Sequence, residues 1–430
     1  MSKKTRDVIV VGFALFAIFF GAGNLIFPPY LGVLSGASWG QSILGFLITD
    51  PVLPILGVIA TAMMGGKAED LGKQVGPRFS IFLAGLSMLA IGPFFSVPRT
   101  AATTHEIAIS QVFPQVPIWV TTVVFFALTL WLVINPSKIM ERVGKFLTPG
   151  LILVLTVIIL AAIFKPAGTL ALREDPGFFL RGFKEGYQTM DALGASLMTG
   201  VVVSDLMTRG YREEKIQRRM AMGAGLVAFI LLAYIYTGLA YLGASSSSFL
   251  TPDMDRTAIL LQSVQAVLGP VGAVVLALAV SLACLTTSVG LTAACGNFFS
   301  TVSKGALSYR LVALVSVGVS FLISLLGVEG IINLAVPILE VLYPVIIALI
   351  VMTFFDRWIV YNWTYTGMVA GAFVCGLIPI LNRYLGLFPG LAERIGGLPL
   401  NQVGMEWLLP ALALSLAMTL LAKWRGAQAS

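Results

Sequence analysis

The sequence predicts an all-α integral membrane protein of about twelve transmembrane helices, and three observations support this. Of the 430 residues, 58% are hydrophobic and 11% are charged, against about 25% charged in soluble domains. Twelve apolar runs are long enough to cross a bilayer, which takes about 20 residues. Basic residues alternate between two sets of loops: 19 lie in one set, seven in the other, and Arg99 lies within a span.

The expected spans are residues 8–34, 40–64, 79–105, 117–135, 147–164, 187–206, 219–244, 264–302, 309–327, 330–354, 363–384 and 403–422. The run 264–302 is longer than a bilayer requires, so we expect a tilt or an extra short helix at its N-terminal end. Loops rich in Lys and Arg face the cytoplasm, which puts both termini there. The net charge of +7 follows from the same rule, so we expect contact with membrane lipid and no nucleic-acid partner.

The first span is interrupted near its centre by Gly21-Ala22-Gly23-Asn24, and two prolines follow. Inside a helix, Gly costs about 1 kcal/mol relative to Ala, and Pro about 3 kcal/mol. Backbone freed from helical hydrogen bonds at membrane depth is tolerated where it faces protein or a water-filled cavity. Two interpretations follow: a discontinuous helix that forms a binding site, or a kinked helix with a small-residue packing face.

A second interrupted span is predicted five spans later. The sixth apolar run carries Asp191, Gly194 and Ala195, and we expect a break near Gly194 with Asp191 at the end of the outer half. Because five helices per repeat is an odd number, the second copy would enter from the opposite side, which gives an inverted 5+5 repeat with broken helices 1 and 6. The expected units are 1–185 (first repeat and outer loop), 186–356 (second repeat) and 357–430 (two appended helices).

Polar groups inside a membrane are costly and therefore mark candidate sites. Free amides of Ala22 and Gly23 would begin a half-helix, whose positive end suits a carboxylate. The Asn24 side chain either supplies an oxygen to a monovalent cation or makes an interhelical hydrogen bond. Asp191 either faces a substrate ammonium group or holds the break together.

Hydroxyl groups cluster in the eighth span, at Thr286-Thr287-Ser288. An isolated Ser or Thr commonly bonds the carbonyl one turn back, whereas three together opposite a broken helix can supply oxygen atoms to Na⁺.

Other polar residues near or within spans are Asp50, Arg99 and Glu340, which form either a gating network or structural ion pairs. The three cysteines lie in apolar runs without metal-ligand spacing, and the chain has one histidine. We therefore expect neither an enzyme nor an organic cofactor.

Two motifs resemble known ones. Residues 21–28 (Gly-Ala-Gly-Asn-Leu-Ile-Phe-Pro) resemble the Gly-x-Gly-Asn-x-x-Phe-Pro signature in the first helix of LeuT-fold neurotransmitter:sodium symporters, and 283–288 (Ala-Cys-Leu-Thr-Thr-Ser) resemble their Ala-x-Leu-Thr-Ser-Ser run. Ile26 stands where the signature usually has arginine, which puts an arginine-based outer gate in doubt. The whole chain resembles the bacterial branched-chain amino acid carrier family (BrnQ, LIVCS).

The resemblance implies a LeuT-type fold and a secondary active symporter that imports leucine, isoleucine and valine by alternating access. The implied substrate site is Gly21, Ala22, Gly23, Asn24, Asp191, Gly194 and Ala195, with the carboxylate on the amides of Ala22 and Gly23. The implied Na⁺ site lies between carbonyls of Ala17 and Phe20 and the eighth-helix residues Ala283, Thr286 and Thr287, with a second ion near Asn24.

Some proton-coupled relatives carry a lysine in the middle of helix five. The run 147–164 has no charged residue, which favours Na⁺ over H⁺ as the coupling ion. Two alternatives stay open: an H⁺-coupled carrier of the same substrates, and a symporter of this fold for another small amino acid or amine. We expect a multi-pass protein of the bacterial cytoplasmic membrane with no obligate protein partner.

Overall fold

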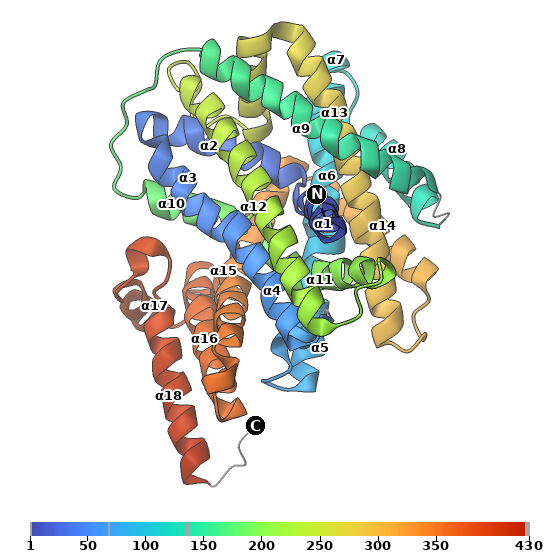
Figure 1. The fold of residues 1–430 in the computed structure, drawn as a ribbon. Coiled ribbons are helices and arrows are strands. Elements are labelled where there is room, and N and C mark those ends of the chain that lie inside the picture. The colour runs from blue at the N-terminus through green and yellow to red at the C-terminus, as the bar shows by residue number, and fades with distance from the viewer. Residues whose placement is uncertain (1, 68, 135–137, 426–430) are drawn as a thin grey trace.

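The computed structural model describes residues 2–67, 69–134 and 138–425, and within them the chain is helical, with no β-strand. Figure 1 shows the arrangement. The α-helices are α1 (Lys3–Phe19), α2 (Ala22–Ser35), α3 (Trp39–Leu47), α4 (Leu53–Met64), α5 (Pro77–Leu89), α6 (Ser96–Thr104), α7 (Ser110–Val112), α8 (Ile118–Ile134), α9 (Lys138–Phe164), α10 (Phe178–Tyr187), α11 (Asp191–Thr208), α12 (Glu214–Ser245), α13 (Arg256–Val302), α14 (Tyr309–Ser324), α15 (Gly327–Phe354), α16 (Asn362–Leu385), α17 (Pro389–Gly396) and α18 (Leu408–Trp424). Short π-helical turns lie at Ile48–Val52, Ala90–Phe94 and His105–Ile109, and 3-10 turns at Gly36–Ser38, Asp70–Gly72, Asp356–Trp358 and Asn401–Val403.

Each of the twelve predicted apolar runs coincides with one or more of these helices. In the described chain, six helices are long and apolar enough to cross a membrane, or seven if α10 and α11 count as one bent span, and four shorter apolar helices accompany them. Residue 135, the expected end of the fourth run, and residues 426–430 of the last unit lie outside the described residues. Of the two alternatives for the long run 264–302, a tilt or an extra short helix at its N-terminal end, the structure contains the extra helix, because α13 kinks at Gly269, whose φ is 69°.

The predicted break in the first span is confirmed: α1 ends at Phe19 and α2 begins at Ala22. In an unbroken helix the Gly21 N–H would bond the Ala17 carbonyl. Here it bonds the Phe19 carbonyl and the Asn24 Oδ1 atom instead. The Ala17 carbonyl is therefore released from the helix at the point where the chain turns.

The predicted position of the second break is wrong. Helices α10 and α11 meet at an angle of 41°, and the break lies at Gln188 to Met190, not near Gly194. Met190 adopts φ 69°, a left-handed conformation uncommon for residues other than glycine. Asp191 consequently begins the second half-helix, and the expected unit boundary at 185/186 falls inside α10.

The two broken spans pack in a reciprocal way. Both α1 and α2 contact α12, whereas α10 contacts α3 and α11 contacts α4. Glycines allow the closest approaches: a Cβ at Gly32 of α2 would collide with the Ala240 carbonyl of α12, and a Cβ at Gly45 of α3 would collide with the Phe179 carbonyl of α10. Helices α16 and α18, orange and red in Figure 1, pack on each other beside α15.

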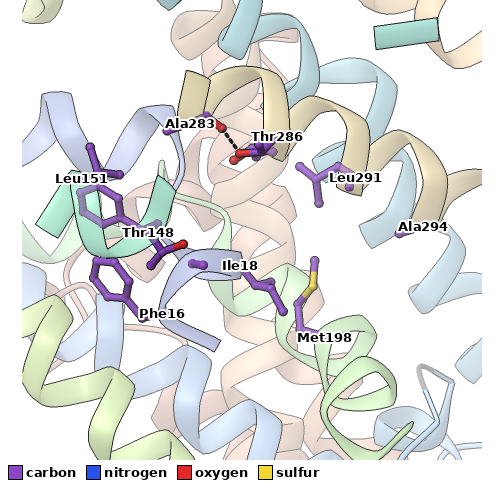
Figure 2. A pocket seen from close by; sticks show the side chains of 13 residues that line it. Phe16, Ile18, Thr148, Leu151, Met198, Ala283, Thr286, Leu291 and Ala294 are labelled. Atoms are coloured by element: carbon purple, nitrogen blue, oxygen red, sulfur yellow. Dashed lines mark hydrogen bonds between the residues drawn. The ribbon is translucent and has the colours of Figure 1, made fainter. Parts of the chain in front are cut away.

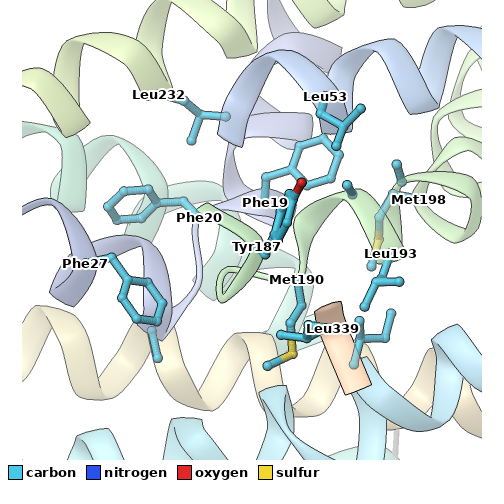
Figure 3. Close-up of a cluster of buried hydrophobic side chains, with 14 of the residues drawn as sticks. Phe19, Phe20, Phe27, Leu53, Tyr187, Met190, Leu193, Met198, Leu232 and Leu339 are labelled. Carbon is cyan, nitrogen blue, oxygen red and sulfur yellow. The ribbon is translucent and has the colours of Figure 1, made fainter. Parts of the chain in front are cut away.

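Aromatic and aliphatic side chains fill the space around both breaks, as Figure 3 shows. Phe19 and Phe20 from the first break and Met190 and Leu193 from the second are at most 2% exposed. The two interruptions therefore lie in the interior of the molecule.

Candidate functional site

All five residues of the implied Na⁺ site line one cavity of about 270 Å³. They are Ala17, Phe20, Ala283, Thr286 and Thr287, and they come from the first break and from α13. Figure 2 shows this cavity, with Ala283, Thr286 and Leu291 on α13, Met198 on α11, and the Thr286 hydroxyl donating to the Ala283 carbonyl at 2.9 Å.

The oxygen atoms that these five residues carry are neutral carbonyls and hydroxyls. No carboxylate belongs to the described lining. The unwound end of a half-helix supplies carbonyl oxygens of the kind that coordinate Na⁺ in discontinuous-helix transporters. The donor set therefore fits a small monovalent cation.

A smaller cavity of about 40 Å³ adjoins the first. Of the implied substrate residues, Gly21, Ala22, Asn24, Asp191 and Gly194 line it. The linings of the two cavities share four side chains: Ile18, Met198, Thr287 and Leu291. The first break and the start of α11 thus meet at one internal space, with Thr287 between its two parts.

Gly23 and Ala195 are outside this lining. A Cβ at Gly23 would lie 2.6 Å from the Arg99 Nη2 atom, so Gly23 provides the space for the guanidinium group. Ala195 packs against α4, where a Cβ at Gly57 would lie 2.8 Å from the Ala195 Cβ atom.

Arg99, on α6, is a positive charge in direct contact with the second break, and it lines the smaller cavity. It is 2% exposed. Its Nη1 atom donates to the Gln188 carbonyl at 2.6 Å and its Nη2 atom to the Thr189 carbonyl at 3.3 Å. Both carbonyls lie just after the C-terminal end of α10, where the second break leaves them without helical partners. The guanidinium group of Arg99 supplies hydrogen bonds to these backbone acceptors.

Asn24 joins four elements. Its Nδ2 atom lies 2.9 Å from Asp50 Oδ2, 2.8 Å from Asp191 Oδ2 and 2.6 Å from the Tyr236 hydroxyl. Its Oδ1 atom accepts the Gly21 N–H at 3.1 Å. Of the two interpretations of Asn24, the structure contains the interhelical hydrogen bond. Asp191 both accepts a hydrogen bond from Asn24 of the first broken span and lines the smaller cavity.

Sequence reasoning did not assign Asp50, Arg99 and Tyr236 to this site. Asp50 and Arg99 could have been assigned to the site because they are charged residues inside apolar spans. The sequence gives no such signal for Tyr236. The gating network considered for Asp50, Arg99 and Glu340 is absent from the described contacts, because Glu340 pairs with Arg383 at 2.9 Å and the other two bind partners at the breaks.

A second arginine, Arg256, bridges three helices. Arg256, at the start of α13, pairs with Glu185 of α10 at 2.9 Å and with Glu329 of α15. Its guanidinium carbon lies 4.2 Å from the ring centre of Tyr30 on α2. Arg256 therefore links α2, α10 and α15, and its guanidinium carbon lies 5.7 Å from the ring centre of Phe27, the residue after Ile26.

Comparison with solved structures identifies the fold. The nucleobase-cation-symport-1 family transporter Mhp1, in a closed, ligand-bound conformation, matches 97% of this chain and 93% of its own with a TM-score of 0.63 and 13% identity. A Na⁺-coupled sialic acid symporter matches 98% of this chain and 90% of its own with a TM-score of 0.62 and 13% identity. The chain thus has the LeuT-type transporter fold that the resemblance implied.

Sequence comparison identifies the family. The model of the family "Branched-chain amino acid transport protein" matches residues 4–425. The branched-chain amino acid permease BraB of Bacillus subtilis is 38% identical over 96% of this chain and 94% of its own length. The permease BrnQ of Escherichia coli is 36% identical over the same shares, and a Pseudomonas aeruginosa carrier protein is 37% identical over 96% of each. The chain is therefore a multi-pass transporter that belongs to the branched-chain amino acid transport protein family.

Proposed function

We propose that this chain is a symporter that imports leucine, isoleucine and valine across the bacterial cytoplasmic membrane, driven by a Na⁺ gradient. The observation that carries the proposal is the adjoining pair of cavities with Thr287 in both linings. An ion and a substrate that touch the same side chain can stabilise the same conformation, and coupling needs this shared preference. The names of the relatives support the substrate class.

The amino acid occupies the smaller cavity in this proposal. Its carboxylate rests on the first amides of α2, at Ala22 and Gly23, beside the guanidinium group of Arg99. A helix N-terminus and a buried arginine both favour a negative charge. The ammonium group faces Asp191, and the aliphatic chain lies against Ile91, Met198 and Leu291, which line the cavity. Because one methylene is worth about 1–3 kcal/mol in such a pocket, the three substrates should compete.

Sodium occupies the larger cavity, held by the Ala17 and Phe20 carbonyls, the Ala283 carbonyl and the two threonine hydroxyls. The Thr286 hydroxyl then turns one lone pair towards the ion while it continues to donate to Ala283, as it does at 2.9 Å. Both termini face the cytoplasm, as the distribution of Lys and Arg indicates, and residues 1–185 and 186–356 hold the two repeats.

Transport by the purified protein in liposomes tests the proposal. An inward Na⁺ gradient at equal pH should accumulate leucine, and excess isoleucine, but not proline, should abolish the accumulation. Proline competition would favour the symporter for another small amino acid. Accumulation driven by a pH gradient without Na⁺ would favour the H⁺-coupled alternative.

The first variant tests the ion site. Thr286→Ala combined with Thr287→Ala removes two of five proposed ligands, so Na⁺ stimulation of leucine uptake should fall at least about tenfold, or roughly 1.4 kcal/mol. The double Thr→Ser variant keeps both hydroxyls and should retain the stimulation. The matched control is Ser281→Ala on the same helix, whose hydroxyl bonds the Ala277 carbonyl at 2.7 Å outside the cavity lining. Unchanged Na⁺ dependence in the double alanine variant would contradict the assignment.

A further inference from the structure

Two carboxyl groups meet at the centre of the protein. Asp50, on the turn between α3 and α4, and Asp191, at the start of α11, both lie within hydrogen-bond distance of the single Asn24 Nδ2 atom, at 2.9 and 2.8 Å. Because both distances end on one nitrogen atom, the two Oδ2 atoms lie at most about 5.7 Å apart. At such a separation two carboxylates repel each other, and a proton on one of them removes the repulsion.

The surroundings of the pair hold one positive charge, and it forms no ion pair with either carboxyl group among the described residues. Asp50 is fully buried, at 0% exposure, and among the described residues neither Asp50 nor Asp191 forms an ion pair with Lys, Arg or His. The groups that face the pair are Asn24 of α2, Tyr236 of α12, Tyr343 of α15, Arg99 of α6 and Thr189 of the second break. Of these only Arg99 is positive, and its described hydrogen bonds go to the Gln188 and Thr189 carbonyls and to neither carboxyl group. Two adjacent carboxylates, of which Asp50 is fully buried and Asp191 is half-buried, cannot both stay ionised under these conditions.

The two aspartates differ in access. Asp191 lines the smaller cavity, whereas Asp50 is not part of the described lining. A cation that enters this cavity therefore meets Asp191 first, with Asp50 behind it. An ammonium group against Asp191 supplies the positive charge that allows both carboxylates to be ionised.

We propose that Asp50 and Asp191 form a proton-binding site that holds one shared proton in the empty transporter, and that the ammonium group of the amino acid displaces this proton. The O–H bond of the shared proton breaks, the proton leaves through the cavity to water, and both carboxylates remain ionised beside the ammonium group. The inference rests on the proposed function, because it takes the amino acid to be the cation that reaches Asp191.

Calorimetry measures the displaced proton directly. Leucine is titrated into the purified full-length protein at saturating Na⁺ and constant pH, in two buffers of different ionisation enthalpy. The difference between the two binding heats gives the number of protons that the protein releases to the buffer per leucine. We expect about one proton released per leucine. Leucine binding without buffer-dependent heat would overturn the proton site and leave the proposed function intact, whereas no binding heat in any buffer would count against the proposed function itself.

Two variants test whether the released proton comes from Asp50 and Asp191. Asp50→Asn removes one of the two carboxyl groups that share the proton. Proton release should therefore fall to near zero, while the heat of leucine binding stays measurable. Asp253 is an exposed loop carboxylate. The Asp253→Asn variant is therefore the matched control and should release the same number of protons as the wild type. Titration of Na⁺ alone is the second control: full proton release at that step would overturn displacement by the ammonium group. If Asp50→Asn fails to fold, the wild-type proton count decides the question by itself.

Discussion

At the residue scale, Gly23 lies where the N-terminus of α2 meets the Arg99 guanidinium group. A Cβ at this position would lie 2.6 Å from Arg99 Nη2 and 2.9 Å from Cζ, too close for the guanidinium group to stay. Arg99 is anchored to two carbonyls of the second break, so Gly23→Ala must displace a bonded group. We expect the KM for leucine uptake to rise at least about tenfold, or roughly 1.4 kcal/mol, and Gly23→Val to be worse.

The control for this prediction is Gly40→Ala on α3, because a Cβ there would meet no atom within 4 Å. Its uptake kinetics should match those of the wild type. Unchanged leucine affinity in Gly23→Val would refute the role of the α2 amides and of the adjacent guanidinium group. Uptake should be compared at equal amounts of protein in the membrane, which separates loss of affinity from loss of folded transporter.

The residue scale also shows what the sequence could predict about the site. Ala17, Phe20, Thr286 and Thr287 were expected together from motif resemblance, and one cavity contains them all. The partners of Asn24 were not predictable in the same way. Asp50 and Tyr236 are 26 and 212 positions away from it, and such contacts depend on the rotation of separate helices, which apolar periodicity does not fix.

At the element scale, the two breaks differ in how visible they are in the sequence. Glycines and prolines mark the first break, and it lies where expected. The second occurs at Gln188 to Met190, which contain no glycine, and Met190 takes the left-handed conformation that glycine usually provides. The polar anchor Arg99, bonded to both break carbonyls, stabilises this break from another helix. A local sequence pattern could not reveal that support, and the sequence analysis therefore placed the break near Gly194.

The start of α1 is tied to the end of α11 by Asp7. Asp7 accepts a hydrogen bond from the Tyr211 hydroxyl at 2.8 Å and pairs with Arg209 at 3.3 Å. The Tyr211 hydrogen bond and the Arg209 charge lower the pKa of Asp7 below its ordinary 3.8, against the opposing effect of burial. A carboxyl group with a lowered folded-state pKa stabilises the fold above its unfolded pKa, and this contribution is lost as pH falls through the folded pKa.

Asp7→Asn should therefore lower Tm at neutral pH, and the difference from the wild type should shrink as the solution is acidified below pH 3.8, the ordinary pKa. Thermal unfolding of the detergent-solubilised protein over a pH series measures both effects. Glu174→Gln, at an exposed loop position, should leave the curve unchanged. A difference between Asp7→Asn and wild type that stays constant down to the lowest pH would mean that the charge of Asp7 is not the cause.

At the scale of the whole molecule, the packing of the broken spans is reciprocal. The first broken span lies on α12 and the second on α3 and α4, and glycines make the close contact in each pair. An inverted repeat produces this relation, since each broken helix packs on the helix that follows the other one. The positions and order of the apolar helices were predictable from hydropathy, whereas the pairing required knowledge of which small residues face each other.

Arg256 connects parts of the molecule that must separate if the end expected to face outside is to open. It binds α10 through Glu185, α15 through Glu329 and α2 through the ring of Tyr30. Arg256→Gln removes charge-assisted hydrogen bonds, each worth about 1.5–3 kcal/mol, from the closed arrangement. The equilibrium should shift towards conformations open at this end by about tenfold or more.

A cysteine at Ser96, which lines the smaller cavity, can report this shift. The three buried native cysteines, Cys284, Cys295 and Cys375, are replaced first, and a membrane-impermeant thiol reagent is added to intact cells. Labelling of Ser96→Cys should become about tenfold faster with Arg256→Gln. Arg383→Gln is the control, because its ion pair with Glu340 lies at the same end but its side chain is 51% exposed and surface pairs contribute little. Equal labelling rates in the two variants would show that Arg256 does not hold this end closed.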